Sequence, residues 1–554
     1  MFVESSSTTI RGKTYTRHLL RRSYREDGKI KHETLGNVSR GTPEEIEAIR
    51  LALKHKGRLA QVLEARPAWR TRQGLSIGAL WTVLTVARRL GIDAALGPTR
   101  SGRLALWQVV ARVLDQGSRL SAVRLAGSHA ACEALSLEAF NEEDLYPNLD
   151  WLAEKQPAIE ARLFRSLRPS IEESGLFLYD VTSSYLEGTQ NELAAFGYNR
   201  DKKKGKMQVV IGLLTTAAGV PVSIEVFEGA TTDPQTFVPQ IRKALERFGA
   251  KDVTFVGDRG MIKAPQIQAL QAEGFHYITA LTKPQILKLL RQGTLQMDLF
   301  DEEVAEVRAA QGARYVLRRN PVRAAELAET RADKLATVRA LAQERSAYLQ
   351  GHSRAQAEVA LRKVQGRAAQ LGIDKWTVVA ADPPERQIAV TVDEAALADE
   401  AQLDGCYALT TDLKPALASA PVVHDRYKDL TLIEQTFRTC KTGELDVRPI
   451  FVRKAARTRA HALVVMLAYR IAHELYDAWR DFNLTVQEGL DQLAQLCLTD
   501  LLADDQPLCC QVPEPRADLR DLLQAARVQL PDALPARKEN VTTKRKLPER
   551  RKKT

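Results

Sequence analysis

Residues near the start of the chain alternate between polar and apolar. Thr14–Tyr24 and Lys29–Leu35 have the pattern of short strands, and the turn residues Glu26-Asp27-Gly28 between them predict a hairpin. The next segment begins like a helix, with Thr42 as its cap and Pro43 in its first turn. The chain is therefore expected to open with a small β-rich region followed by a helix.

Apolar residues then recur three and four positions apart. Residues 44–170 are predicted to be mostly helical on this basis, as in Ile77–Leu90 and Leu104–Leu114. The same spacing returns late in the chain, where Asp429–Lys441 and Arg457–Trp479 are predicted to be helices. Both ends of the chain thus contain long amphipathic helices.

Short apolar runs replace this helical pattern from residue 175. Two segments read as helices, Pro234–Phe248 and Ala264–Glu273, and the runs around them read as strands. The order is β-β-β-α-β-α-β, which is the leading half of an RNase H-like sheet. We expect an α/β fold with a mixed five-stranded sheet and helices on both faces. The predicted strands are Leu176–Tyr179, Met207–Thr215, Val220–Phe227, Val253–Gly257 and His276–Leu281.

A long segment separates this unit from its second half. It contains a predicted hairpin, Val304–Arg308 with Tyr315–Arg319. An Ala/Arg/Glu-rich stretch, Ala324–Leu371, reads as a pair of charged helices broken near Gly351. Strand-like patterns return at Lys375–Ala381, Gln387–Val392 and Cys406–Thr410.

These patterns divide the chain into seven regions. The core of the fold is expected in two halves on either side of an insertion, with a helical domain before it. The boundaries are 1–60 (basic, β-rich), 61–170 (helical), 171–282 (first half of the core), 283–412 (insertion), 413–480 (second half of the core), 481–530 (helical) and 531–554 (disordered basic tail).

Composition and charge narrow the class of protein. The net charge of +11 is concentrated at the ends, with +6 in residues 1–60 and +7 in residues 537–554, so the middle is near neutral. Basic ends indicate contact with phosphates, although a tail that only keeps the protein in solution has the same composition. No signal peptide or membrane span is predicted, and the six scattered cysteines lack zinc spacing, so a cytoplasmic location is expected.

Three carboxylates stand out as candidate catalytic groups. Asp180 and Asp258 each follow an apolar strand, so adjacent strands would bring them together at one edge of the sheet. Two close carboxylates repel each other unless a cation lies between them, and Mg²⁺ prefers oxygen ligands. Glu434 shares a polar helix face with Arg438 and Lys441, opposite an apolar stripe. Each signal alone is more often a turn residue or a surface ion pair.

The segments around these carboxylates resemble the DDE transposases of bacterial insertion sequences. The blocks LYDVTSSYLEG, GYNRDKKKGKMQVVIGLL and VGDRGM are similar to those around the family's first and second Asp. The branch with a Tyr-x2-Arg-x3-Glu-x6-Lys motif is matched by Tyr427, Glu434 and Lys441, whereas Leu430 takes the Arg position. Lys428 or Arg438 is a candidate for the missing cation. The resemblance covers roughly residues 140–475.

This resemblance implies a function and a set of partners. The chain would cleave transposon ends and join them to target DNA by two-metal phosphoryl transfer, with Asp180, Asp258 and Glu434 holding two Mg²⁺ or Mn²⁺ ions. Tyr427 and Lys441 would contact phosphates of the transposon end. The partners would be double-stranded DNA, as terminal inverted repeats and target, with a dimer of the chain in the synaptic complex and no nucleotide cofactor.

The helical region 61–170 is a candidate for binding the transposon ends, and further residues are candidates for DNA contact. Four lysines, Lys202, Lys203, Lys204 and Lys206, follow the first Asp and either track a DNA backbone or form a solvated loop. Arg259 directly follows the second Asp. Related enzymes stack a tryptophan of the insertion on a flipped base, and Trp376 lies in the insertion here, but a tryptophan packed in a core is the commoner case.

Two other functions remain open at this point. An RNase H-like nuclease would cleave without joining, and a DNA-binding relic would do neither. Other recombination chemistries fit poorly, because His461 is followed by Ala-Leu-Val rather than by the spacing of a tyrosine recombinase, and no ATP-binding Walker A segment occurs.

Overall fold

The computed structural model divides into two compact units, which are described separately. It describes residues 1–10, 13–54, 69–198, 200–201, 203–308, 313–441, 445, 447, 450–503, 506–534 and 541. The first unit comprises Met1–Ser76, Leu496–Pro515 and Leu530–Arg537, and the second comprises Ile77–Gln495, Arg516–Gln529 and Lys538–Thr554. Most of the basic tail, including 535–540 and 542–554, lies outside the described residues.

The first unit opens with the predicted hairpin and helix. Three antiparallel strands, β1 (Phe2–Ile10), β2 (Lys13–Glu26) and β3 (Lys29–Asn37), are followed by helix α1 (Pro43–Lys54). Asp27 and Gly28 connect β2 to β3 with φ values of 49° and 75°, the left-handed conformation that a two-residue hairpin turn requires. Thr42 and Glu45 cap α1, because the threonine hydroxyl accepts from the Glu45 N–H and the Glu45 carboxylate accepts from the Thr42 N–H.

A second small sheet in this unit contradicts two predictions. Strand β4 (Trp69–Ser76) pairs with β15 (Cys497–Ala503), which pairs in turn with β16 (Gln506–Gln511). Residues 61–170 and 481–530 were both expected to be helical. The physical reason is that a strand is stabilised by its partner, and the partner of β4 lies more than 400 residues along the chain, where local periodicity carries no information about it.

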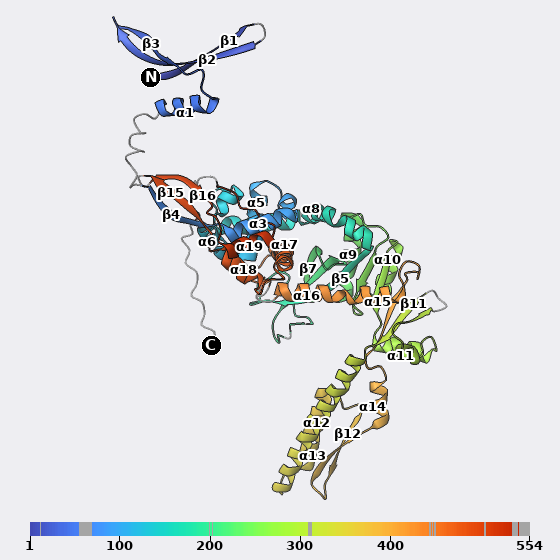
Figure 1. The fold of residues 1–554 in the computed structure, drawn as a ribbon. Coiled ribbons are helices and arrows are strands. Elements are labelled where there is room, and N and C mark those ends of the chain that lie inside the picture. Colours follow the sequence, from blue (N-terminus) through green and yellow to red (C-terminus); the bar gives the residue numbers. More distant parts are fainter. Residues whose placement is uncertain are drawn as a thin grey trace. The chain divides into compact units, whose positions relative to one another are not determined.

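One large mixed sheet organises the second unit (Figure 1). Its order is β10-β11-β14-β9-β8-β5-β6-β7, in which β5, β8 and β9 run parallel and the other pairs are antiparallel. The mixed α/β class is confirmed, but the sheet has eight strands rather than five. The added strands β10, β11 and β14 had been assigned to the insertion. The strands are β5 (Leu176–Tyr185), β6 (Gln208–Thr216), β7 (Pro221–Glu228), β8 (Thr254–Gly257), β9 (His276–Ala280), β10 (Ala305–Arg308), β11 (Arg314–Arg319) and β14 (Cys406–Thr411).

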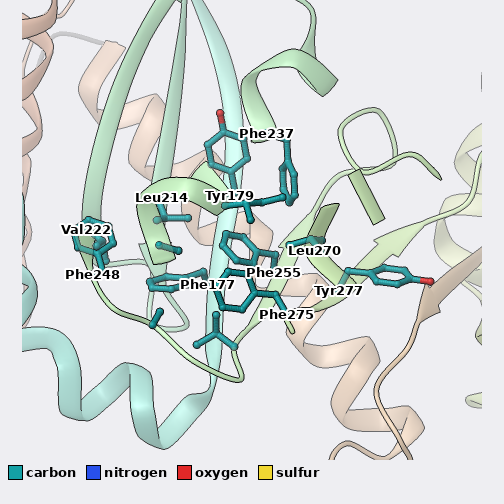
Figure 2. Close-up of a cluster of buried hydrophobic side chains, with 14 of the residues drawn as sticks. Phe177, Tyr179, Leu214, Val222, Phe237, Phe248, Phe255, Leu270, Phe275 and Tyr277 are labelled. Atoms are coloured by element: carbon teal, nitrogen blue, oxygen red, sulfur yellow. The ribbon is translucent and has the colours of Figure 1, made fainter. Parts of the chain in front are cut away.

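A cluster of aromatic rings packs on this sheet (Figure 2). Phe177 and Tyr179 of β5 lie beside Phe255 of β8, and Phe237 packs edge-on against both Tyr179 and Phe255. All four side chains are buried, and each contributes on the order of 2 kcal/mol through burial. The cluster fixes β5 against β8, and the two aspartates follow directly from this pairing. The helices at this sheet are α9 (Asp233–Arg242), which continues as a short π-helix (Lys243–Arg247), α10 (Ala264–Ala272), α15 (Ala420–Lys428) and α16 (Leu430–Lys441).

Helices before and after the sheet pack together around α17 (Ala455–Ala478). This helix contacts α8 (Glu142–Ser174), α5 (Arg100–Leu114), α3 (Gly78–Arg89) and β7, and most of its residues are buried. The predicted helices at 77–90, 104–114 and 457–479 are therefore confirmed. The remaining helices here are α4 (Ile92–Leu96), α6 (Arg119–Ser128), α7 (Ala131–Leu135), α18 (Val486–Leu493) and α19 (Ala517–Ala525). No helix among the described residues is long and apolar enough to cross a membrane.

The charged helices form a hairpin, as predicted (Figure 1). Helix α12 (Pro321–Gly351) lies against α13 (Ala357–Leu371), and both pack on the two-stranded sheet of β12 (Thr377–Asp382) and β13 (Gln387–Val392). These elements share a hydrophobic core of their own. The other elements of this region are α11 (Lys283–Arg291), the 3-10 helix Asp298–Phe300 and α14 (Glu394–Ala401).

Candidate active site

Asp180 lies within a strand rather than at its end. Strand β5 continues to Tyr185, and Asp180 pairs with Leu213 of β6. On its other side β5 runs parallel to β8, which ends at Gly257 opposite Tyr179. The residue that follows Tyr179 is Asp180, and the residue that follows Gly257 is Asp258. The two aspartates are therefore at the same level of the sheet. The predicted neighbourhood of the two strands is confirmed, and the predicted strand end is wrong for Asp180.

The charge on Asp180 is destabilised by its surroundings. Burial, together with the negative charges of Asp258 and Glu434, raises the pKa of Asp180 to about 7. The Val181 N–H, which donates to Oδ1 at 2.7 Å, and the Arg200 guanidinium act in the opposite direction and favour the charged form. Asp258 and Glu434 are therefore close enough to Asp180 to act on it electrostatically, although 176 residues of chain separate them from each other.

Asp258 is exposed, and two donors hold its carboxylate. Its Oδ1 accepts from the Arg259 N–H at 2.7 Å and from the Tyr427 hydroxyl at 3.0 Å. Burial and the charge of Asp258 raise the pKa of Tyr427 far above its ordinary value, so the hydroxyl keeps its proton and can donate at any working pH. Tyr427, which was expected to contact a phosphate, thus hydrogen-bonds to a candidate catalytic carboxylate.

Glu434 is presented by an amphipathic helix, as the sequence predicted. Leu430, Ile433 and Phe437 are the buried stripe of α16, and the helix packs on β5. Thr436 adds a hydrogen bond of 3.0 Å between its hydroxyl and that of Tyr469 on α17. Glu434 lies on the exposed side of the helix. The stripe therefore fixes the rotation of α16, and this rotation directs Glu434 away from the core.

Lys441 is held inside the protein. Its Nζ lies 3.0 Å from Oδ1 of Asp201, and the two side chains are only 11% and 4% exposed. The other oxygen of Asp201 accepts from the Tyr185 N–H at 3.3 Å. In this structure Lys441 therefore ties the end of α16 to the segment after β5, and its charge faces a carboxylate rather than solvent.

The lysines after β5 differ in their surroundings. Lys202 lies outside the described residues. Lys203 and Lys204 are exposed, with the Lys203 ammonium 5.8 Å from the Tyr185 ring centre, whereas Lys206 forms an ion pair of 2.7 Å with Glu187. Three further candidates for DNA contact are exposed: Arg259, Lys428 and Arg438.

Trp376 is a core residue. Its side chain is 2% exposed, inside the cluster formed by α12, α13, β12 and β13. Stacking on a base requires a free ring face, and burial removes it in this structure. The expectation that Trp376 stacks on a flipped base is not met, because the tryptophan supplies the centre of the core that the insertion needs to fold.

Two cations near the aspartates were not singled out from the sequence. Arg200, whose charge acts on Asp180, forms an ion pair with Asp233 at the start of α9. Arg200 and Asp233 line a pocket together with the second cation, Lys263, and with Gly260 and Tyr198. The Arg200 guanidinium lies 5.7 Å from the centre of the Tyr198 ring. Arg200 belongs to one of the sequence blocks quoted above, whereas nothing in the local pattern indicated Lys263.

The side chains of the three acids do not form a closed metal cage. Among the described residues, no group of three or more His, Cys, Asp or Glu is close enough to enclose an ion. Asp180 and Asp258 each direct one oxygen to a donor of the protein. What the site does have is an accumulation of negative charge around a partly buried carboxyl.

Comparison with known proteins places this site in a family. The family model described as "Transposase DDE domain" matches residues 172–471, more than half of the chain, and the "IS1634 family transposase, N-terminal domain" matches residues 3–66. No curated protein matches. A cryo-EM structure of the piggyBac transposase synaptic complex with hairpin DNA is 8% identical over 75% of each chain, with a TM-score of 0.31, which is too low to inform this fold. The match over residues 172–471 includes Asp180, Asp258 and Glu434, and on this basis the chain belongs to the DDE transposases of bacterial insertion sequences.

Proposed function

We propose that this transposase cuts DNA at the ends of its transposon and joins the released 3′-hydroxyls to target DNA, with Asp180, Asp258 and Glu434 as the catalytic residues. In cleavage, a water oxygen attacks the scissile phosphorus and the 3′-oxygen leaves. In joining, that 3′-hydroxyl attacks a phosphorus of the target strand and the target's own 3′-oxygen leaves. In both steps an incoming oxygen replaces a 3′-oxygen on the attacked phosphorus, so the same three acids serve both.

The observation that supports this proposal most strongly is the electrostatic contact of the three acids. They come from β5, from the end of β8 and from α16. Burial, with a further contribution from the negative charges of Asp258 and Glu434, raises the pKa of Asp180 to about 7. A fold gains no stability from gathering like charges around a half-buried carboxyl. Such arrangements are typical of functional sites.

The same observation indicates that divalent cations belong here. A cation bound between the carboxylates would offset the repulsion that destabilises charged Asp180, and carboxylate oxygens are the ligands that Mg²⁺ and Mn²⁺ accept. Asp180, Asp258 and Glu434 would hold the ions once their side chains turn toward one another. When bound, two such ions activate the attacking oxygen and stabilise the leaving one.

Other residues of the chain position the acids and the DNA. Tyr427 orients the carboxylate of Asp258 through its hydrogen bond. Lys441 holds α16 in place through Asp201. The exposed cations Arg259, Lys428 and Arg438 would bind DNA phosphates beside the acids. Because a transposon has two ends, two copies of the chain would act together on them.

A joining assay separates this proposal from a nuclease. The full-length chain is incubated with Mg²⁺, a target plasmid and duplexes that carry the inverted repeat flanking its gene, already cut at the 3′ end. We expect covalent linkage of the duplex to the plasmid. Nicking of the plasmid without linkage would instead establish a nuclease, and binding without either reaction would establish a DNA-binding protein that has lost its chemistry.

A further inference from the structure

The N-terminal sheet has two faces with different properties. Residues paired across neighbouring strands project to the same side of a sheet. Arg21 of β2 pairs with Phe2 of β1, and Ser23 of β2 pairs with His32 of β3, so all four share one side. The Phe2 and His32 rings meet edge to face at 5.5 Å, and Ser23 hydrogen-bonds to His32 at 3.0 Å, which confirms this arrangement. We call this side the open face.

Helix α1 lies on the other side, which we call the covered face. Arg50 of α1 hydrogen-bonds to Ser5 of β1, and Ser5 hydrogen-bonds at 2.6 Å to its partner His18 on β2. Ile46 of the same helix is 5% exposed. The covered face is thus the side on which the small domain builds its core. Among the described residues, no helix of this small domain lies on the open face.

Cations on the covered face are neutralised within the sheet. Arg22 forms an ion pair of 2.7 Å with Glu33, its partner across β2 and β3. Lys31 forms an ion pair of the same length with Glu26. Arg22 and Lys31 therefore have carboxylate partners and offer little net charge to an outside partner.

The open face carries a row of arginines instead. Arg17, Arg21 and Arg25 occur every fourth residue on the central strand β2, and every second residue of a strand faces the same side. Arg21 pairs with Glu4, whereas neither Arg17 nor Arg25 has an ion-pair partner among the described residues. Tyr15, on the same face, is 60% exposed. A row of arginines beside an exposed tyrosine does not stabilise the fold, because the positive charges repel one another and the tyrosine ring is exposed to water.

We infer that the open face binds duplex DNA in the major groove and is the element that reads the transposon end. The inference rests on the function proposed above and adds the region that recognises the DNA. Four residues of a strand span about 14 Å, close to the major-groove width of about 12 Å, so neighbouring arginines of the row can reach the two backbones on either side of one groove. Ser23 and His32 then lie between the arginines, where hydroxyl and imidazole groups can bond to base edges.

Two triple variants of the full-length chain test the inference. The open-face triple is Arg17→Gln, Arg21→Gln and Arg25→Gln. The covered-face triple is Arg22→Gln, Lys29→Gln and Lys31→Gln, which removes the same charge from the same sheet. Binding is measured without divalent ions, as a function of salt, on a duplex with the inverted repeat and on a scrambled duplex of equal composition. A third protein, in which Lys replaces the three open-face arginines, controls for folding.

The open-face triple should lose at least about tenfold in affinity for the inverted repeat, and its log–log salt slope should fall by about two to three units, since each lost phosphate contact removes about 0.9. The covered-face triple should change the slope of log affinity against log salt concentration by less than about one unit. The lysine variant should keep both the salt slope and the preference for the repeat of the wild type, because lysines also contact phosphates and Ser23 and His32 are unchanged. Equal losses in the two Gln triples, or an unchanged open-face triple, would overturn the inference. The joining activity of the wild-type chain is measured separately. If the wild type joins ends, the proposed function stands whichever result the variants give.

Discussion

The hydroxyl of Tyr427 donates a hydrogen bond to Oδ1 of Asp258 across 3.0 Å. The tyrosine is the last but one residue of α15, and the aspartate follows β8, so this bond links the two halves of the interrupted domain at the candidate active site. A motif tyrosine that was expected to bind DNA therefore holds a candidate catalytic carboxylate in this structure.

Tyr427→Phe is expected to slow joining without weakening DNA binding. The variant removes one hydrogen bond to a charged group, worth about 1.5–3 kcal/mol, which corresponds to roughly a tenfold to hundredfold loss of rate if the bond orients Asp258 during the reaction. The measurement is the joining rate at saturating DNA, alongside end affinity. Tyr476→Phe, at an exposed tyrosine of α17, is the matched control and should react at the wild-type rate. A loss confined to DNA affinity would show that the hydroxyl contacts phosphate instead.

Lys441→Met is expected to destabilise the fold. Removal of the lysine leaves Asp201 charged and buried, and breaking a buried ion pair from one side costs about 3–5 kcal/mol. The comparison is Lys206→Met, which breaks a pair with Glu187 whose side chains are 40% and 46% exposed and should cost less than about 1 kcal/mol. Thermal unfolding by calorimetry compares the two. Equal melting temperatures would mean that Lys441 serves DNA binding alone.

His461 is expected to make the stability of the chain depend on pH. Burial and the charges of Arg112 and Arg119 lower its pKa well below 6.5, and Arg119 donates to its Nδ1 at 3.2 Å. The unfolded chain therefore binds a proton at a higher pH than the native chain, so the free energy of unfolding falls as pH drops below about 6.5, by at most about 1.4 kcal/mol per pH unit.

The His461→Gln variant tests this dependence. Glutamine can also accept from Arg119 but does not titrate, so the variant should lose less stability than the wild type between pH 7 and pH 5. Denaturant unfolding at several pH values measures the difference. Parallel stability curves for the two proteins would show that the pKa of His461 is the same in the native and the unfolded chain, and would contradict the prediction.

The parts of the site that sequence predicted are those set by local pattern. Asp258 follows a short apolar strand, and the stripe of Leu430, Ile433 and Phe437 fixes which side of α16 carries Glu434. Both features are encoded within about ten residues of the acid concerned. The mixed α/β class followed in the same way from the order of the strands.

What sequence missed depends on partners distant along the chain. Strand β4 exists because β15 pairs with it, and the sheet has eight strands because β14 joins β9 to the hairpin of β10 and β11. The same holds for side chains. Lys441 meets Asp201, 240 residues earlier, and Trp376 is buried by helices that precede it. In each case a residue that looked available for DNA is engaged by a contact that no local pattern encodes.

The central claim is that Asp180, Asp258 and Glu434 perform the chemistry together. The most direct measurement is the joining rate of pre-cut ends with Mg²⁺ for Asp180→Asn, Asp258→Asn and Glu434→Gln, each with its end affinity. Asp252→Asn is the matched control, because this exposed aspartate precedes β8 whereas Asp258 follows it, and its φ of 51° suits asparagine. Each triad variant should join at least about a thousandfold more slowly while binding ends normally, and the control should react like the wild type. A triad variant that still joins within a few fold of the wild-type rate would contradict the account.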